Sequence, residues 1–283
     1  MKPQRVIVAL LLIMTAMMLP PASSFAQEDL PAYWRDRGTG ISISQFGTYV
    51  RKGELLLYPF YEYYHDNNLE YEPFDFGFRS IQEYRGRYRA NEGIFFIGYG
   101  ISDRIAVEFE IAAISVKFDK SKIDFSPVPA RIEDSGLGDV EGQIRWRWNQ
   151  EGADKPEYFS YFETVFPTGK KHSLIGTSDW EFKLGTGLIK GFKWGTLTIR
   201  SAVEYSAAEK TFGHGEYAFE YLKKMSKHFR FFAMLEGSED EVALIPEIQW
   251  HLGSNVFVKA NNGFGVTSKA TDFAPEIGVM FSF

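Results

Sequence analysis

Residues 140–148 of the chain read "VEGQIRWRW". Apolar or small residues alternate here with Glu, Gln and Arg, and successive side chains of a β-strand point to opposite faces. One face of this stretch would therefore be apolar and the other polar. A strand of this kind buries one face only, as strands do in a membrane barrel or in a two-sheet sandwich.

The same alternation recurs in twelve segments along the chain. Each is about as long as a tilted strand must be to cross a bilayer. An even number of strands is typical of single-chain bacterial barrels. The second segment is the longest, and residues 91–93 predict a bulge that interrupts it. The segments are 53–65, 79–100, 103–118, 138–149, 156–167, 178–190, 193–207, 213–224, 227–237, 240–252, 254–264 and 271–283.

The composition narrows the class of protein. Aromatic residues make up 17% of the chain and charged residues 24%, and there is no cysteine. A chain without cysteine is not a small disulfide-stapled scaffold, and the net charge of −6 gives no sign of nucleic-acid binding. No run of about 18 apolar residues follows residue 26, so the sequence predicts no membrane-spanning helix.

A closed barrel fits the pattern better than a sandwich. The polar rows carry Glu and Arg on most strands, whereas the solvent face of a sandwich would often show Lys, Thr and Ser. Trp and Tyr flank the apolar rows, as they do at membrane interfaces. No segment has the Pro and Lys protection of an exposed edge strand. The sequence therefore predicts an all-β, closed antiparallel transmembrane β-barrel of about twelve strands.

The amino end predicts export. Lys2 and Arg5 precede an apolar run that ends at two prolines, and small residues follow up to Ala26. We interpret residues 1–26 as a signal peptide, with a retained anchor as the alternative. Residues 27–52 do not alternate and could form a plug in the barrel, a cap on its periplasmic mouth or a loosely ordered lead-in. Residues 53–283 would form the barrel in the cell outer membrane.

The connections fall into short and long ones. Residues 101–104, 190–194, 225–228 and 252–255 form tight turns, and longer links lie at 66–78, 119–137 and 168–177. Short turns are typical of the periplasmic end of a barrel and long loops of the extracellular end. With twelve strands, both termini would lie on the short-turn side.

Several motifs resemble those of one family. They are "YGISDR" at 99–104, "SGLGDV" at 135–140 and "FPTGK" at 166–170, followed by a final Phe283. Their order resembles the outer-membrane barrels grouped as transporters of the phenol-degradation (MetA-pathway) type. The resemblance implies a porin-like passive pore or transporter for a small solute. By analogy with the family this solute would be hydrophobic, but the resemblance does not identify phenol as the substrate.

The end of the chain also resembles a general signal. A last strand that finishes on an aromatic residue is similar to the signal that the barrel-assembly machinery reads in Gram-negative outer-membrane proteins. The residues that fit it are Ile277, Val279, Phe281 and Phe283. The partners implied are outer-membrane lipid, that machinery and an unidentified small solute, without nucleic acid.

The polar rows predict which side chains line the lumen. They could form cross-strand ion pairs that fill the interior, or a path whose charges select a solute. A barrel of eight strands is filled by its own side chains, and one of sixteen strands encloses an aqueous channel. Twelve strands lie between these cases, so the strand number does not decide between a filled lumen and a channel. A basic cluster at 85–89 and 145–147 could attract an anion. The predicted lumen residues are Glu62, Glu83, Arg85, Arg87, Arg89, Glu108, Glu110, Glu141, Arg145, Arg147, Glu163, Glu181, Lys183, Arg200, Glu204, Glu220, Arg230, Glu247, Lys259 and Glu276.

The sequence does not predict an enzyme. An outer-membrane lipid hydrolase needs a Ser–His pair with an orienting third group on the outer face near the rim. His172 and Ser173 are neighbours in an expected loop, and His214 has no serine close in sequence. No metal cluster or cofactor fingerprint is present. A structural or surface-interaction barrel with a filled lumen and a lipid hydrolase remain the alternatives to a pore.

Overall fold

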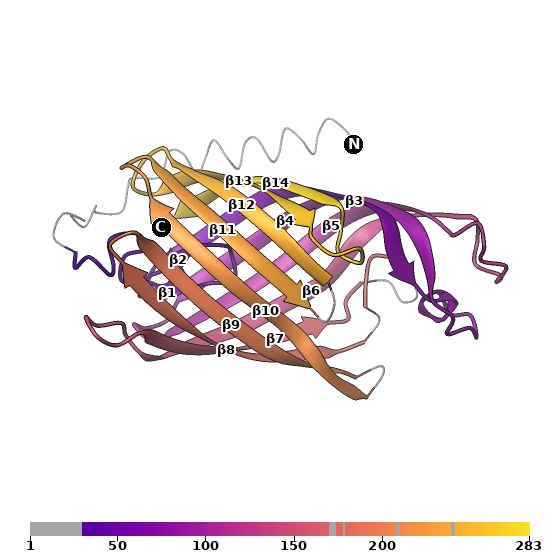
Figure 1. Cartoon of the computed structure of the whole chain (residues 1–283), viewed down its shortest axis with the longest axis horizontal. Coiled ribbons are helices and arrows are strands. Elements are labelled where there is room, and N and C mark those ends of the chain that lie inside the picture. The colour runs from indigo at the N-terminus through magenta and orange to yellow at the C-terminus, as the bar shows by residue number, and fades with distance from the viewer. Residues whose placement is uncertain (1–29, 170–173, 178, 208–209, 239–240) are drawn as a thin grey trace.

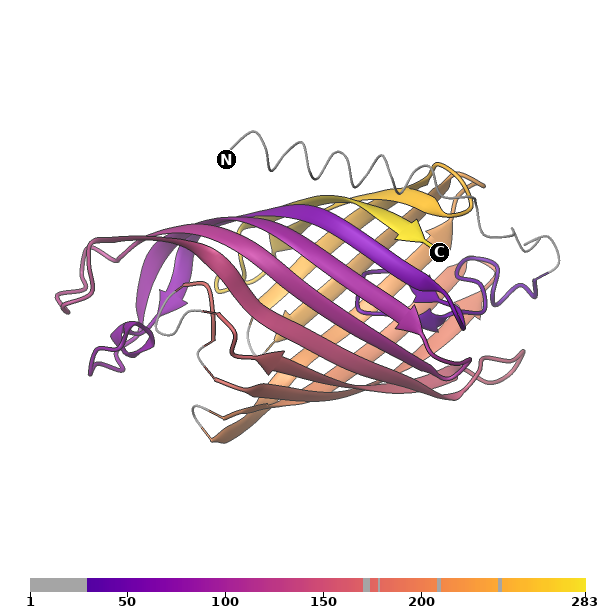
Figure 2. The ribbon, with the colours of Figure 1, turned by 180° about the vertical axis from the view of Figure 1, so that it is seen from behind.

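Twelve long strands form one closed antiparallel barrel, which confirms the predicted fold class (Figures 1 and 2). The structure is a computed structural model that describes residues 30–169, 174–177, 179–207, 210–238 and 241–283. The predicted signal peptide lies outside the described residues. The barrel strands are β3 Leu55–Tyr71, β4 Tyr84–Gly100, β5 Ile105–Asp119, β6 Arg131–Asn149, β7 Glu157–Phe166, β8 Glu181–Phe192, β9 Gly195–Ser206, β10 Thr211–Lys224, β11 Phe229–Ser238, β12 Glu241–His251, β13 Val256–Gly265 and β14 Phe273–Ser282.

The last strand closes the barrel against the first. β14 pairs with β3, so that Ile277 lies opposite Tyr61, and the Leu55 amide donates to the Phe283 carbonyl at 3.0 Å. Closure removes sheet edges whose unpaired backbone groups would each cost several kcal/mol in hydrocarbon. It also explains why the chain ends on an alternating apolar row.

The alternation in the sequence becomes an apolar outside and a polar inside. On β12, Ile248 and Trp250 are exposed on the outer face, while Glu247 and Gln249, which alternate with them, are almost completely buried. Stacked aromatic pairs such as Phe229 with Trp250 lie on the outer face near the short-turn end. Aromatic rings at this position are typical of the interfacial girdle of a membrane barrel.

The predicted bulge at residues 91–93 is wrong. β4 keeps a continuous register with β3 and β5 through this stretch, and the structure places bulges elsewhere, for example between Asp66 and Leu69 of β3. Tyr61 lies opposite Gly93, and its hydroxyl donates to Asn91 Oδ1 at 2.7 Å. A cross-strand aromatic residue thus accommodates small and polar residues without breaking the ladder.

The two ends of the barrel differ. β3 to β6 have 15 to 19 residues and extend beyond the shorter strands towards the right in Figure 1. A 3₁₀ turn, η1 Pro73–Phe76, lies in one of the long connections at that end. The tight connections and the C-terminus lie at the opposite end, as predicted. No helix within the described residues is both long enough and apolar enough to cross a membrane.

A small hairpin lies inside the short-turn end of the barrel. Its strands are β1 Ile41–Ser42 and β2 Tyr49–Val50, and both views show it enclosed by the barrel wall (Figures 1 and 2). Ile41 and Val50 are at most 1% exposed and pack in one apolar cluster with inward-facing residues such as Tyr58. The apolar core is therefore inside this half of the barrel.

Candidate functional site

Buried ion pairs hold the N-terminal segment, residues 30–52, to the barrel wall. Arg37 Nη2 lies 2.9 Å from Glu151 and 3.0 Å from Glu157, and Arg147 Nε lies 3.1 Å from Glu157. All four side chains are at most 3% exposed. Burial by itself would lower the pKa of Arg37, but the carboxylates of Glu157 and Glu151, together with Tyr49, outweigh it and raise that pKa. Arg37 therefore stays charged within the lumen.

The tip of the hairpin is attached to β5, the neighbour of β6 in the barrel. The Ser44 amide donates to Glu108 at 2.9 Å, and Gln45 Nε2 donates to Glu110 at 3.0 Å. Arg145 Nε lies 3.4 Å from the same Glu108. Together with the Arg37 cluster, these contacts hold the hairpin to the β5–β7 side of the barrel. On the opposite side, Gln249 Nε2 of β12 donates to the Phe46 carbonyl at 3.1 Å.

Arg145 and Arg147 serve this attachment. Arg145 donates to Ser42 Oγ at 3.4 Å, and Arg147 donates to the carbonyls of Thr39, at 3.2 Å, and Gly40. Both side chains are almost completely buried. They are therefore occupied by the N-terminal segment and by acids of the wall, which leaves them unsuited to attract a free anion.

One glycine of the wall permits a close approach of this segment. The Gly191 amide donates to Glu151 at 2.7 Å, and a Cβ at Gly191 would lie 1.9 Å from the Tyr33 carbonyl oxygen. That neighbour is backbone and cannot rotate away. Any other residue at position 191 would displace the chain around Tyr33.

We expect Gly191→Ala to loosen the N-terminal segment without unfolding the barrel. Overpacking of this kind costs about 1–3 kcal/mol, so chymotryptic cleavage at Tyr33 and Trp34 in the folded protein should rise roughly tenfold. Gly152→Ala is the matched control, because nothing lies within 4 Å of a Cβ there. Equal cleavage rates for the two variants would show that the close contact does not hold the segment.

We expect Arg37→Met to release the segment more strongly. Removing one partner of a buried charge cluster costs about 3–5 kcal/mol, so chymotryptic cleavage between residues 30 and 52 should rise on the order of a hundredfold or more. Arg35→Met is the control, since the guanidinium of Arg35 is exposed and contacts the Lys193 carbonyl. A heat-modifiability gel checks that the barrel stays folded, and cleavage no faster than in the control would contradict the expected role of Arg37.

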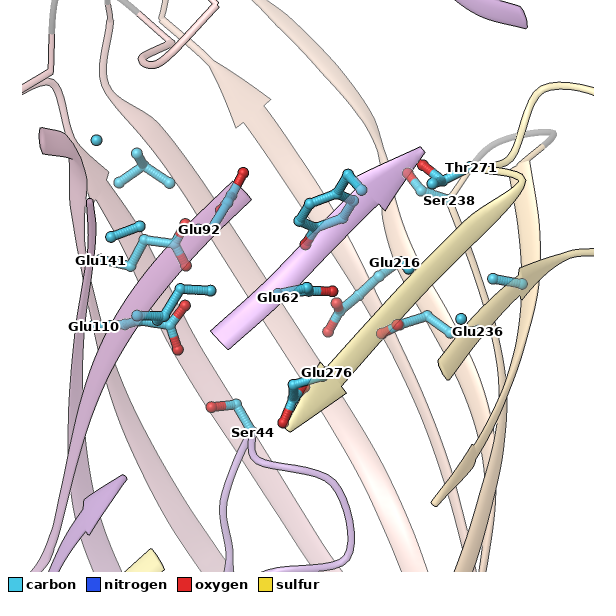
Figure 3. Close-up of a pocket in the computed structure, with 18 of the residues that line it drawn as sticks. Ser44, Glu62, Glu92, Glu110, Glu141, Glu216, Glu236, Ser238, Thr271 and Glu276 are labelled. Atoms are coloured by element: carbon cyan, nitrogen blue, oxygen red, sulfur yellow. The ribbon is translucent and has the colours of Figure 1, made fainter. Parts of the chain in front are cut away.

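An outer cavity of about 960 Å³ lies beyond the hairpin, on the long-loop side. Ser44, Gln45 and Phe46 of the hairpin tip line it together with the barrel wall, and Figure 3 shows Ser44 at one end. The wall contributes ten acidic side chains and one basic side chain, Lys183. The acidic residues are Glu62, Glu92, Glu110, Asp139, Glu141, Glu204, Glu216, Glu236, Glu241 and Glu276.

Part of this acidity is neutralised. Arg200 forms ion pairs with Glu216, Glu220 and Glu236, and Lys183 Nζ lies 2.9 Å from Glu163. These pairs match the predicted cross-strand network.

Other acids of the outer cavity lack such partners. Among the described residues, Glu62, Glu92, Glu110 and Glu141 form no ion pair with Lys or Arg. In Figure 3, side chains from several strands converge on this space. The outer cavity is thus a space of about 960 Å³ lined by several carboxyl groups that lack a basic partner.

An inner cavity of about 560 Å³ lies on the other side of the hairpin. Residues 38–40 and Tyr49 line it from the N-terminal segment. Most of the charged side chains that line it are basic, and Glu54 is the one acidic side chain among its lining residues. The basic and histidine residues are Arg37, Arg51, Lys224, Lys227, His228, Arg230 and His251. The two sides of the hairpin therefore carry opposite charge.

Most predicted lumen residues lie on inward-facing rows, although their role in a solute path stays a prediction. Sixteen of them do: Glu62, Glu108, Glu110, Glu141, Arg145, Arg147, Glu163, Glu181, Lys183, Arg200, Glu204, Glu220, Arg230, Glu247, Lys259 and Glu276.

The other four do not face the lumen. Glu83 is exposed in the loop before β4, and Arg87 and Arg89 are exposed on the outer face of β4, as the alternation with buried Ala90 requires. Arg85, on the same face, pairs with Glu70 at 2.8 Å. The wrongly placed bulge explains the error at Arg85, Arg87 and Arg89, because a shift of one residue at 91–93 reverses the faces of the side chains on one side of it relative to the other.

The same error explains why Glu92 was missing from the predicted lumen residues. It lies between Ala90 and Ile94 on the inward row of β4, and an unbroken alternation through residues 91–93 would have identified it. The contacts of Ser44 and Gln45 carried no signal in the sequence, because they depend on how an irregular segment folds back into the barrel.

A Ser–His pair lies on the outer face, although the sequence did not indicate it. Ser201 Oγ is 3.2 Å from His214 Nε2, where a bulge in β10 after His214 shifts the register with β9. Ile199 and Val203, both more than half exposed, flank Ser201 on the same face. Within the described residues no carboxylate is bonded to His214, so the pair lacks the orienting group of a hydrolase. His172 and Ser173 lie outside the described residues.

The fold and the lumen together define a class of protein: a closed twelve-stranded barrel with an apolar outside and a charged interior, as found in bacterial outer membranes. Among solved structures, the chain is similar to an outer membrane channel from Pseudomonas putida F1, with 11% identity and a TM-score of 0.61 over 86% of this chain and 100% of that one. It is also similar to the translocator domain of the autotransporter NalP from Neisseria meningitidis, with 11% identity and a TM-score of 0.50 over 82% and 89% of the two chains. At this identity the likeness shows the fold. No family model and no curated protein sequence matches the chain.

Proposed function

We propose that this protein is a passive outer-membrane channel for small hydrophilic solutes that favours cations. The observation that carries the proposal is the outer cavity of about 960 Å³, in which ten acidic side chains face one basic one. An interior filled by its own side chains would leave no such space. A purely structural barrel would be expected to pair the acidic side chains of its interior with basic ones. Here only some of the inward-facing acids are paired, which favours a channel.

The charge of the outer cavity gives the preference for cations. Rings of carboxylates select cations in pores, and a concave, poorly screened surface of one sign raises the local concentration of the opposite ion. The basic inner cavity would let a cation leave rather than bind tightly. A hydrophobic solute, suggested by family analogy, fits this lining less well.

The N-terminal segment restricts passage in this proposal. Its hairpin lies between the two cavities and is hydrogen-bonded to β5, β6 and β12. Channel opening would require the hairpin to shift or leave the lumen. Export by residues 1–26 and insertion through the C-terminal residues from Ile277 to Phe283 belong to the same proposal.

Single-channel recording of the refolded protein, residues 27–283, in a planar bilayer tests this function. A tenfold gradient of KCl should give a reversal potential whose sign corresponds to cation preference. Circular dichroism and a heat-modifiability gel establish that the protein is folded. A folded, inserted barrel that never conducts would contradict the proposal and favour a structural or surface-interaction role.

A further inference from the structure

The outer face of β4 and β5 carries basic side chains that a channel does not use. Arg89 lies directly opposite His65 of β3 and Lys117 of β5, so three basic residues form one row across three strands. Arg87 follows two positions further along the same face. Like charges directly opposite each other in a sheet repel, so this row needs a compensating anion.

The acids on this face are already engaged. Asp119 faces Arg87 and is bonded to Arg131 at 2.7 Å, and Glu133 pairs with Lys117 at 3.3 Å. Within the described residues, neither the Arg87 nor the Arg89 guanidinium forms a hydrogen bond or an ion pair. Asp119 attracts both guanidinium groups, but within the described residues neither of them has a hydrogen-bonded or ion-paired partner.

The height of the row matches the outer boundary of the membrane. Arg89 lies eleven positions above Gly100, the inner end of β4. At about 3.4 Å per residue and a tilt of about 45°, this is roughly 26 Å along the barrel axis, close to the ~25 Å apolar band of such barrels.

We infer that Arg87 and Arg89, with Lys117, form a binding site for the phosphate groups of an outer-leaflet glycolipid. Guanidinium groups bind phosphate oxygens through paired, charge-assisted hydrogen bonds, and the acyl chains of the same lipid would lie on the apolar face of β4 and β5 below. The inference rests on the proposed function only in that it assumes an outer-membrane location.

Titration of the detergent-solubilised, folded protein with fluorescent diphosphorylated lipid A tests this site. Arg87→Gln/Arg89→Gln should weaken binding on the order of tenfold, and Arg87→Lys/Arg89→Lys should lose less. The control is Arg104→Gln/Lys193→Gln, which removes two exposed cations from the short-turn end and should leave binding unchanged. Dephosphorylated lipid A should bind the protein about as weakly as the Gln variant binds lipid A.

Several outcomes would overturn the inference. They are equal binding of phosphorylated and dephosphorylated lipid, equal loss in the control variant, or full competition by inorganic phosphate at the lipid's own concentration, which would indicate a site for free phosphate. The channel is tested separately by recording the same variants. Normal conductance without lipid A selectivity would refute this site alone, and lipid A selectivity without conductance would refute the channel alone.

Discussion

Removing residues 27–50 is expected to raise single-channel conductance on the order of tenfold, because the hairpin that lies between the two cavities would then be gone from the lumen. The hairpin β1–β2 lies between the two cavities, and its residues line both of them. Its removal also leaves Glu151 and Glu157 without Arg37, but water would then reach both carboxylates. The measurement is the unitary conductance of the refolded variant beginning at Arg51.

A tethered variant provides the opposite test. The described residues contain no cysteine, so Gln45→Cys and Glu110→Cys can be joined selectively by a short bismaleimide. These two side chains, one on the hairpin and one on β5, are hydrogen-bonded to each other. The joined protein should lose its spontaneous openings, and singly substituted protein treated with the same reagent should keep them. Unchanged conductance in both the truncated and the tethered protein would show that the segment does not restrict the pore.

Replacing Glu62, Glu92 and Glu141 with Gln is expected to reduce the ratio of cation to anion permeability by roughly threefold or more, when the ratio is measured at a pH that keeps all three carboxyl groups ionised. These carboxylates face the outer cavity from three strands and form no ion pair with Lys or Arg among the described residues. None of them is hydrogen-bonded to the hairpin, so the barrier itself should persist. The measurement is the reversal potential in a KCl gradient, which should move towards zero.

The control for this variant removes the same charge outside the lumen. Glu83→Gln, Asp103→Asn and Asp154→Asn change three exposed acids of the connections and should leave the reversal potential unchanged. The difference between the two variants should grow at low ionic strength, where charges are less screened. If both variants shifted the potential equally, selectivity would follow net charge rather than the acids of the cavity.

The strands were predictable because each carries its own local pattern. The row Val140–Trp148 alternates strictly, and in the barrel its Arg145 and Arg147 point inward while Ile144 and Trp148 are exposed outside. Alternation could not locate bulges, and one misplaced bulge reversed the face assigned to Arg87 and Arg89. A single residue of register is enough for this error, since neighbouring side chains of a strand point in opposite directions.

The sequence by itself determined the closed barrel, its twelve strands and the apolar belt, because a repeating pattern of period two depends only on nearest neighbours along the chain. The tertiary structure alone decided what the lumen contains. An irregular segment with no repeat enters the barrel and engages Arg37, Ser44 and Gln45 with residues more than sixty positions away. Those contacts separate an acidic cavity from a basic one, and only strand registers and chain reversal in three dimensions could bring these side chains together.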